Sequence, residues 1–196
     1  MGSHLWWYTA RASGIVAWVL VTASVLWGLA LASRLTRRPK PAWVLDLHRF
    51  LGGASVVFVA VHLLALSLDQ YVGFGLDDLF VPMASVWKPG AVAWGIVALY
   101  LLIAVEVTSL LMRRLPRKLW RAVHLMSFAV FGGTTVHALL AGTDANDVTV
   151  QWIALASTAL VAFLAMFRVL ADRRTPRSAP AAAPSVSRLS TRPRSG

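Results

Sequence analysis

Five long apolar stretches constrain this chain more than any other feature of its sequence. They cover residues 13–32, 43–68, 91–112, 119–141 and 148–170. Each reaches about 20 residues or more, the length that an α-helix needs to cross a hydrocarbon core of about 30 Å. None alternates apolar and polar residues as the strands of a membrane barrel do. The sequence therefore predicts an all-α integral membrane bundle of five transmembrane helices, with no evident internal repeat.

The composition supports this fold class and excludes several kinds of chemistry. Of the 196 residues, 58% are hydrophobic and only 14% are charged, which is too apolar for an ordinary soluble domain. The absence of cysteine excludes disulfides, thiolate catalysis, iron–sulfur clusters and cysteine-ligated zinc. The first stretch could be a signal peptide. However, it is longer than the apolar core of most signal peptides and a basic cluster follows it at once, so we interpret it as a true span.

Basic residues fall almost entirely on one side of the predicted bundle. They lie in the first connection, in the third connection and after the fifth span: Arg34, Arg37, Arg38, Lys40, Arg113, Arg114, Arg117, Lys118, Arg121, Arg168, Arg173, Arg174, Arg177, Arg188, Arg192 and Arg194. Cytoplasmic loops are enriched in Lys and Arg, so we expect the N-terminus outside and the C-terminus in the cytoplasm. A net charge of +11 placed beside the spans suits the anionic lipid of the cell membrane rather than nucleic acid.

The ends of the chain differ in character. Residues 1–170 are expected to form the membrane bundle, and residues 171–196 a disordered basic cytoplasmic tail, because they are rich in Pro, Ala, Ser and Arg without apolar periodicity. The outer connection 67–90 is long for so small a bundle. Apolar residues beside two aspartates predict a short interfacial helix near residues 76–80.

Four histidines lie inside the apolar stretches, two in the second and two in the fourth. His48 and His62 are 14 residues apart, about 21 Å along an ideal helix and within about 40° of one face. His124 and His137 are 13 residues apart, or about 140° on an ideal helix. The fourth helix should therefore be overwound or kinked, or its two histidines face different directions. A kink is easiest at the glycines 132–133.

Both of these helices run in the same direction, so the histidines form pairs at two depths. We refer to His48 and His124, in the cytoplasmic half, as the inner pair, and to His62 and His137 as the outer pair. Haem iron takes two axial imidazoles, and a flat apolar porphyrin fits between the helices of a bundle. Ionisable groups inside a membrane are costly and usually functional. The pattern therefore predicts two haems, with all four histidines as iron ligands.

Other residues near the histidines are candidates for the cofactor site. Gly52 lies one turn after the inner histidine of its helix and Gly133 one turn before the outer histidine of its helix, so both leave room on a ligand face. Arg49 and Arg121 flank the inner pair and are candidates to bind the haem propionates. A single histidine or glycine in a span more often serves hydrogen bonding or close packing. The prediction therefore depends on the four histidines together.

These residues resemble the ferric reductase-like transmembrane domain family. The spacings His48-x13-His62 and His124-x12-His137, and the segments LDLHRFLGG and RAVHLMSFAVFGGTTVHALLAGTD, are similar to those of bacterial stand-alone members. The resemblance covers residues 43–170. The family includes NADPH oxidases, ferric reductases and the membrane haem subunit that serves periplasmic methionine sulfoxide reductase. It implies that the four histidines bind two b-type haems that pass electrons across the membrane within an oxidoreductase system.

The chain also departs from the family pattern. Many members have six spans, and the oxidases and iron reductases continue into a flavin and nicotinamide domain, whereas this sequence shows five spans and no Gly-rich dinucleotide loop. The donor is therefore expected to be a separate cytoplasmic flavin reductase or a membrane quinol, and the acceptor on the outer side stays open. Two alternatives remain: a His-lined divalent-metal transporter, and a quinol-linked cytochrome b of another family.

Glu106 is the one carboxylate deep in a predicted span. A buried carboxylate needs a partner, so we expect an ion pair with Arg34, Arg49 or Arg121. The functional alternative for Glu106 is a proton relay or a quinone contact near the inner haem.

Overall fold

The computed structural model describes residues 3–32, 41–70 and 72–173, and every regular element within these ranges is a helix. The helices are α1 (Ser3–Ala32), α2 (Ala42–Leu68), α3 (Leu76–Phe80), α4 (Pro89–Leu110), α5 (Arg117–Leu125), α6 (Ser127–Ala141) and α7 (Val148–Arg173). Five helical segments of this part of the chain are long and apolar enough to cross a membrane, with α5 and α6 together forming the fourth. The prediction of an all-α, multi-pass membrane bundle with five spans is therefore confirmed.

Two predictions concern residues at the edge of, or outside, the described parts of the chain. The helix α7 reaches Arg173, so the first residues of the predicted disordered tail are helical. The rest of that tail and the first basic cluster, Arg34, Arg37, Arg38 and Lys40, lie outside the described residues. Which end of the bundle faces the cytoplasm stays a prediction.

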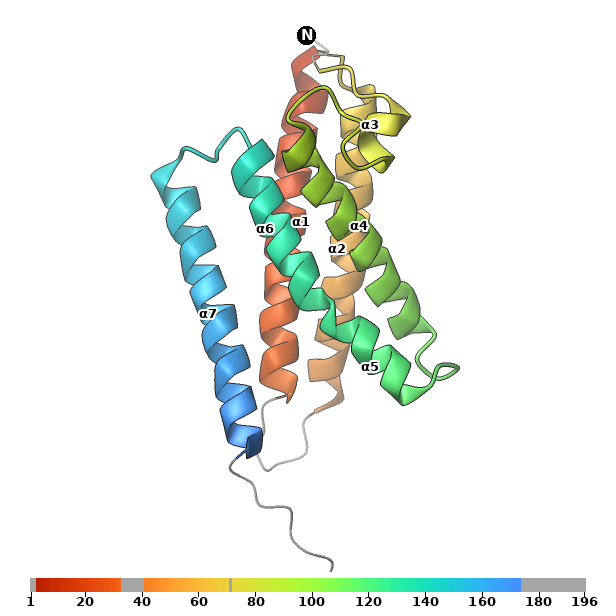
Figure 1. The fold of residues 1–196 in the computed structure, drawn as a ribbon, viewed down its shortest axis with the longest axis vertical. Helices are drawn as coiled ribbons and strands as arrows, with labels where there is room; N and C mark the ends of the chain where they lie inside the picture. Colours follow the sequence, from red (N-terminus) through yellow and green to blue (C-terminus); the bar gives the residue numbers. More distant parts are fainter. Residues whose placement is uncertain (1–2, 33–40, 71, 174–196) are drawn as a thin grey trace, which may run out of the picture.

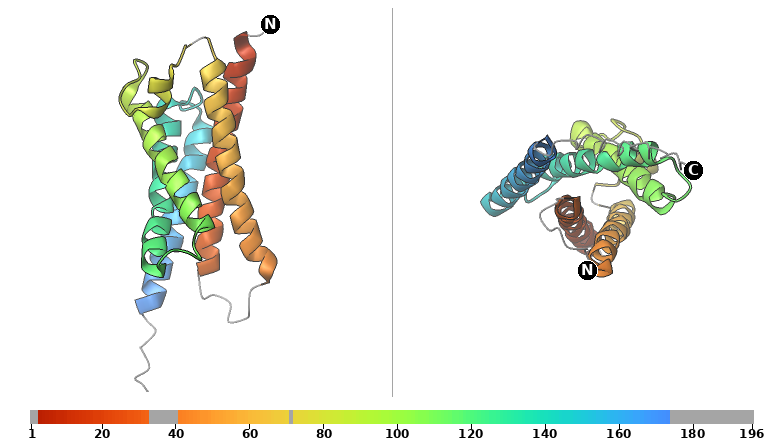
Figure 2. Two further views of the ribbon diagram at one scale, coloured as in Figure 1. Left: turned by 90° about the vertical axis from the view of Figure 1, so that its right-hand side faces the viewer. Right: turned by 90° about the horizontal axis from the view of Figure 1, so that it is seen from below.

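The helix α1 lies at the centre of the bundle. It packs along α2 and also contacts α6 and α7, and α7 forms one flank of the molecule (Figure 1). Seen along the bundle axis, α1 and α2 form one layer, and α4, α5, α6 and α7 form an arc across it (Figure 2). The helix α1 therefore lies beside α2, and α4 lies beside α6; neither α1 nor α4 carries one of the four paired histidines.

Proline marks the start of three helices. Pro41 and Pro116 directly precede α2 and α5, and Pro89 is the first residue of α4. Proline suits these positions because its φ is already helical and it lacks an N–H that the first turn would leave unpaired. The helix α7 is instead preceded by Asp147, whose carboxylate accepts the N–H of Thr149 at 2.7 Å. Hydrogen bonds from Thr149 and the following N–H hold the pKa of Asp147 below its usual value.

The fourth span is broken at Met126. The N–H of Met126 donates to the carbonyl of Val123, three residues back, at 2.9 Å, and its ψ of −9° is that of a tightened last turn. The helix α6 then continues without interruption through Gly132 and Gly133. The expected interruption between the two histidines is therefore present, but its expected place at the glycine pair is wrong.

Buried side chains fill the middle of the bundle, at the depth between the two histidine pairs. Val21 of α1, Leu102 of α4 and Phe131 of α6 are each at most 6% exposed and belong to one apolar cluster. Ser55 of α2, halfway along the chain between the two histidines of its helix, is 1% exposed and donates to the carbonyl of Gly52. This level therefore separates the two ends of the bundle with tightly packed side chains.

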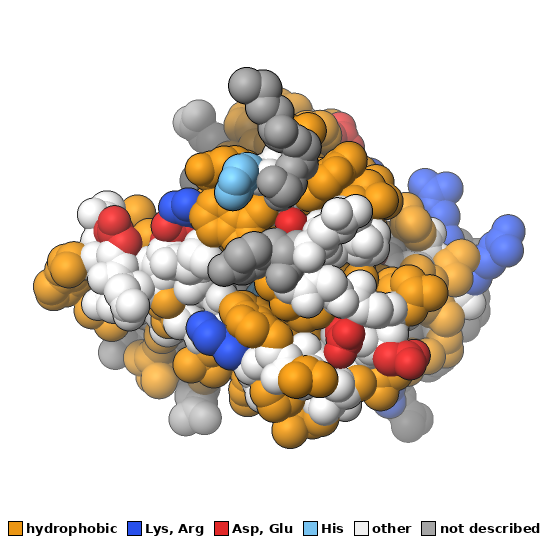
Figure 3. Space-filling view, turned by 90° about the horizontal axis from the view of Figure 1, so that it is seen from above, with side chains coloured by type: hydrophobic (Ala, Val, Ile, Leu, Met, Phe, Trp, Pro, Cys, Tyr) orange, Lys and Arg blue, Asp and Glu red, His pale blue; other side chains and the backbone are white. Residues whose placement is uncertain are grey.

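Polar contacts tie the connections together at the end of the bundle that carries the N-terminus. Arg11 of α1 forms an ion pair with Asp144, which follows α6, and Lys88 donates to the carbonyl of Leu140 at 2.9 Å. Figure 3, which views this end, shows acidic and basic side chains scattered among apolar ones. The predicted short helix is confirmed as α3, and Tyr100 of α4 donates to the carbonyl of Phe80 at its end.

Candidate functional site

The inner pair comes together from α2 and α5. The ring centres of His48 and His124 are 6.0 Å apart, and their planes cross at 75°. Two imidazoles that bind one metal ion on opposite sides have centres roughly 6 Å apart, because each metal–nitrogen bond is about 2 Å long. The structure thus brings together the two inner histidines that their depth in the sequence predicts. Their role as iron ligands stays a prediction.

The outer pair is held by backbone carbonyl groups. Nδ1 of His62 lies 2.7 Å from the carbonyl oxygen of Ala10 in α1, and Nδ1 of His137 lies 2.8 Å from that of Ala91 in α4. A carbonyl oxygen can only accept, so each Nδ1 carries the hydrogen. Nε2 of each neutral ring therefore keeps a free lone pair, which is the form that a metal requires.

The inner pair faces serine hydroxyls instead. Nδ1 of His48 is 3.4 Å from Oγ of Ser24 in α1, and Nδ1 of His124 is 3.4 Å from Oγ of Ser109 in α4. The ring of Trp120 stacks on His124 at 5.1 Å with a 24° angle between planes. The indole nitrogen of Trp120 is buried and has no hydrogen-bond partner among the described residues. His48 also contacts the backbone of Ser24. The inner pair therefore differs from the outer pair in having a serine hydroxyl beside each ring.

Three glycines make room for the histidine rings. A Cβ added at Gly14 would lie 3.0 Å from Nδ1 of His62, and one at Gly28 would lie 3.1 Å from Cε1 of His48. A Cβ at Gly95 would lie 2.7 Å from Nδ1 of His137. A real Cβ atom is essentially never found as close as 2.7 Å, so the position of Gly95 requires His137 to shift if another residue replaces glycine. The contacts at Gly14 and Gly28 are tighter than nine in ten real Cβ contacts, so a side chain there would require the ring to move by a few tenths of an ångström.

Sequence reasoning missed these three glycines, although a signal for them exists. Gly14 and Gly28 of α1 are 14 residues apart, as are the two histidines of α2 that they contact. The pattern also recurs along the chain. Ala10, Gly14 and Gly28 are matched by Ala91, Gly95 and Ser109, each 81 residues further on. Members of both sets contact a histidine, so α1 with α2 and α4 with α5–α6 repeat one arrangement. The expectation of no internal repeat is therefore corrected for these helix contacts, which occur twice along the chain.

The two glycines expected to flank the cofactor, Gly52 and Gly133, contact residues other than the histidines. A Cβ at Gly133 would lie 3.2 Å from that of Ala98, so the close packing of α4 on α6 accounts for this residue. Gly52 lies against the carboxylate of Glu106. Neither contact involves a histidine, and a role for Gly52 and Gly133 toward haem stays a prediction.

Glu106 does not form the expected ion pair with Arg49 or Arg121. Arg49 instead lies 3.5 Å from Asp46, one turn earlier on α2, and both side chains are more than 60% exposed. Glu106 is partly buried and has no hydrogen-bond or ion-pair partner within the described part of the chain. The third expected partner, Arg34, lies outside the described residues.

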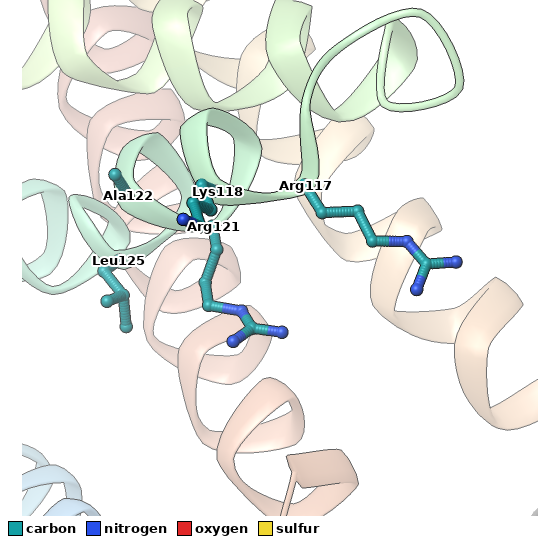
Figure 4. Close-up of a pocket in the computed structure, with 5 residues that line it drawn as sticks. All are labelled: Arg117, Lys118, Arg121, Ala122 and Leu125. Atoms are coloured by element: carbon teal, nitrogen blue, oxygen red, sulfur yellow. The ribbon is translucent and has the colours of Figure 1, made fainter.

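The helix α5 carries a basic surface next to the inner pair. An open pocket there is lined by Arg117, Lys118, Arg121, Ala122 and Leu125. The side chains of Arg117 and Arg121 extend away from the helix (Figure 4). Arg121 is thus exposed and available to an anion, but no contact ties it to the inner histidines. Arg113 and Arg114, in the connection between α4 and α5, are also exposed and add to the positive charge of this end.

The histidines occur in pairs rather than in larger clusters. Among residues 3–32, 41–70 and 72–173, no three His, Cys, Asp or Glu side chains lie close enough together to hold a metal ion. A bare divalent cation in a protein usually takes at least three protein ligands. An iron already bound by a porphyrin needs only two. The donor set therefore suits haem better than a bare ion.

Comparison with known families agrees with this geometry. A family model described as "Ferric reductase like transmembrane component" matches residues 13–135, which is more than half of the chain. The matched range runs from α1 into α6, includes His48, His62 and His124, and ends two residues before His137. The comparisons with curated proteins and with solved structures give no match.

Proposed function

Because the chain belongs to the family of ferric reductase-like transmembrane components, we propose that it carries electrons across the membrane through two b-type haems. Domains of this family usually bind haem. The proposal is carried by one observation on the outer pair. Nδ1 of each outer imidazole is taken up by a backbone carbonyl, which leaves Nε2 free for a metal.

The surroundings of the histidines support a haem rather than another cofactor. The glycines at positions 14, 28 and 95 remove the side chains that would collide with three of the four rings. The two imidazoles of a pair come from different helices, as axial ligands on opposite faces of a ring must. The buried, unpartnered indole N–H of Trp120 is a donor for an anionic group such as a propionate.

The residues of the chain have separate roles in this proposal. The inner and outer pairs each hold one haem, and Arg49 and Arg121, each within one turn of an inner histidine along its helix, bind the inner propionates. When bound, haem supplies a one-electron redox couple. Val21, Leu102 and Phe131 fill the level between the pairs and exclude water from it.

For the electron donor, we favour a separate cytoplasmic flavin reductase that docks on the basic end of the bundle. The cations of α5 are exposed and the pocket between them is open, so an anionic protein surface would be attracted there, more strongly at low salt. The second candidate is a quinol near Glu106, which is favoured by the lack of any ion-pair partner for this carboxylate in the described structure. The acceptor is on the opposite side of the membrane, and its class stays open.

The two candidate donors lead to different predictions for the rate of haem reduction in proteoliposomes. With a docking reductase, reduction slows as salt rises and after neutralisation of Arg113, Arg114, Arg117 and Lys118. With a quinol, reduction is insensitive to salt and to these substitutions but responds to Glu106→Gln. Salt-independent reduction by every reductase tested, together with fast reduction by quinol, would exclude docking and leave the haem proposal intact.

The proposal as a whole is tested by the optical spectrum and haem content of the purified protein. We expect two b-type haems per chain, both six-coordinate and low-spin. Fewer than two haems in folded, fully loaded protein contradicts the proposal. Binding of zinc or copper without haem would support the competing function, a divalent-metal transporter.

A further inference from the structure

The hydroxyl groups of two serines behave differently from the others in the spanning helices. Most hydroxyls here donate to a carbonyl of their own helix, one turn back: Thr9, Ser13, Thr22, Ser55, Thr108, Thr134 and Thr158. This is the usual solution for serine and threonine inside a helix. The hydroxyls of Ser24 and Ser109 instead lie 3.4 Å from Nδ1 of a histidine on another helix.

Ser24 and Ser109, which contact the inner pair, do not occupy equivalent positions on α1 and α4. Ser109 of α4 stands where α1 has Gly28, whereas Ser24 lies one turn before Gly28. Both nevertheless place Oγ at the same distance from the Nδ1 of an inner histidine. The contact between a serine hydroxyl and an inner histidine is therefore repeated in the two halves of the bundle, although the serines stand at different positions on their helices.

This contact can do for the inner pair what the carbonyls do for the outer pair. A hydroxyl both donates and accepts, so Oγ can accept from an Nδ1–H. An imidazole that donates through Nδ1 keeps Nε2 free and is a more basic ligand. Without an acceptor, the buried N–H would lose its hydrogen bond to water and gain nothing in return.

We propose that Ser24 and Ser109 are positioning residues of the inner pair. Each hydroxyl accepts the Nδ1–H of its histidine, fixes the ring with Nε2 free toward the other histidine, and so sets the iron affinity and the reduction potential of the inner site. The inference rests on the proposed function, because it assigns these serines to a haem.

The test compares Ser24→Ala, Ser109→Ala and the double variant with the wild type. The readouts are haem affinity by titration, the two components of a redox titration, and the low-spin EPR signal, whose shape depends on the angle between the ligand planes. Loss of such an outer partner typically weakens metal binding about 10- to 100-fold. We expect that loss at the inner site, together with a positive shift of its potential and a changed EPR signal. The effect of Ser109→Ala should be larger than that of Ser24→Ala, because the backbone of residue 24 also contacts His48 and is kept in the alanine variant. The outer component stays unchanged.

Matched variants separate this effect from simple loss of a hydroxyl. Ser55→Ala and Thr108→Val remove hydroxyls that bond to their own helix, so neither should shift the inner component. Ser24→Thr and Ser109→Thr keep the acceptor and should restore wild-type behaviour. If the double alanine variant does not fold, each single variant should still shift the inner component alone.

The outcomes distinguish this inference from the proposed function. A wild-type protein that binds no haem overturns both. Wild-type protein with two haems, whose inner potential and EPR signal are unchanged in Ser24→Ala and Ser109→Ala, overturns the positioning role and leaves the proposed function standing. An equal shift of both components also overturns it, because the serines would then act on the whole fold.

Discussion

The outer and inner histidine pairs are built in different ways. All four rings are partly buried, and His62 and His137 each donate a short hydrogen bond to a backbone carbonyl. His48 and His124 face serine hydroxyls at a longer distance, and His48 also contacts the backbone of Ser24. A backbone acceptor cannot be removed by a side-chain substitution, whereas a hydroxyl can. The outer site is therefore fixed by the path of the chain, and the inner site depends more on side chains, most of all at His124.

The helix that carries His124 adds to this difference. The helix α5 has nine residues, none of them buried, and is separated from α6 by the break at Met126. Short helices gain most of their stability from packing, and α5 has little of it. The position of His124 is therefore less constrained by the bundle than that of His137, and a bound cofactor would contribute more to holding it.

The largest expected effect is the loss of one haem from single histidine variants. His62→Ala and His137→Ala should remove the outer redox component, and His48→Ala and His124→Ala the inner one, because each iron loses an axial ligand. The haem-to-protein ratio should fall from two to one. His4→Ala, in the first turn of α1, is the control and should keep both. Loss of both haems in every single variant would show that the two sites are not independent.

The effects of glycine-to-alanine substitutions should increase as the added Cβ comes closer to a neighbouring atom. Gly95→Ala places a Cβ nearest to a histidine, and Gly14→Ala and Gly28→Ala follow. Overpacking in a core costs about 1–3 kcal/mol, so the thermal stability and haem content in detergent should fall, most for Gly95→Ala. Gly53→Ala and Gly132→Ala are controls because a Cβ there meets nothing within 4 Å. Equal effects in all five variants would contradict the conclusion that Gly14, Gly28 and Gly95 make room for the histidine rings.

Substitution of Arg49 or Arg121 should have a smaller effect, confined to the redox behaviour and haem occupancy of the inner site. Replacing either with Gln should shift the inner reduction potential or lower its haem occupancy, since a cation near the propionates is removed. The shift should be modest for Arg49, because its side chain is 61% exposed and lies near Asp46. Arg168→Gln on α7 is the control. If neither substitution changes the inner component, the propionate assignment is wrong.

The smallest effect is expected at Asp147, which belongs to neither site. Hydrogen bonds to its carboxylate lower its pKa, so this contribution to stability is present above the unfolded-state pKa of 3.8 and is lost as pH falls through the lower folded-state pKa. Asp147→Ala should reduce thermal stability at pH 7, and the difference from wild type should vanish in strong acid. Both redox components should be unchanged. A shift in either would mean that α7 contributes to a haem site.

The fold was predictable because the length of an apolar stretch is a local property. The five spans and the short helix α3 could be read directly from residue runs. The break at Met126 could not be located, because the 13-residue spacing requires an adjustment but no glycine or proline marks where it occurs. The kink was expected at the glycines 132–133 because glycine is the most flexible residue. The helix α6 instead continues through them, and Gly133 packs closely against Ala98.

The histidines were predictable because two spacings and two depths agree within the sequence. Their neighbours were not, because a helix face shows which residues lie together but not which helix packs there. Gly52 was expected beside the cofactor on this ground and lies instead against Glu106. Gly14, Gly28 and Gly95 become significant only when α1 is placed beside α2 and α4 beside α6.

The pairing of the histidines is tested most directly by the haem content of matched double variants. The account predicts that His48→Ala/His124→Ala and His62→Ala/His137→Ala each retain one haem per chain, because each combination empties one site and spares the other. His48→Ala/His137→Ala and His62→Ala/His124→Ala should retain none, because each combination damages both sites. One haem retained by His48→Ala/His137→Ala, with none in His48→Ala/His124→Ala, would contradict the account.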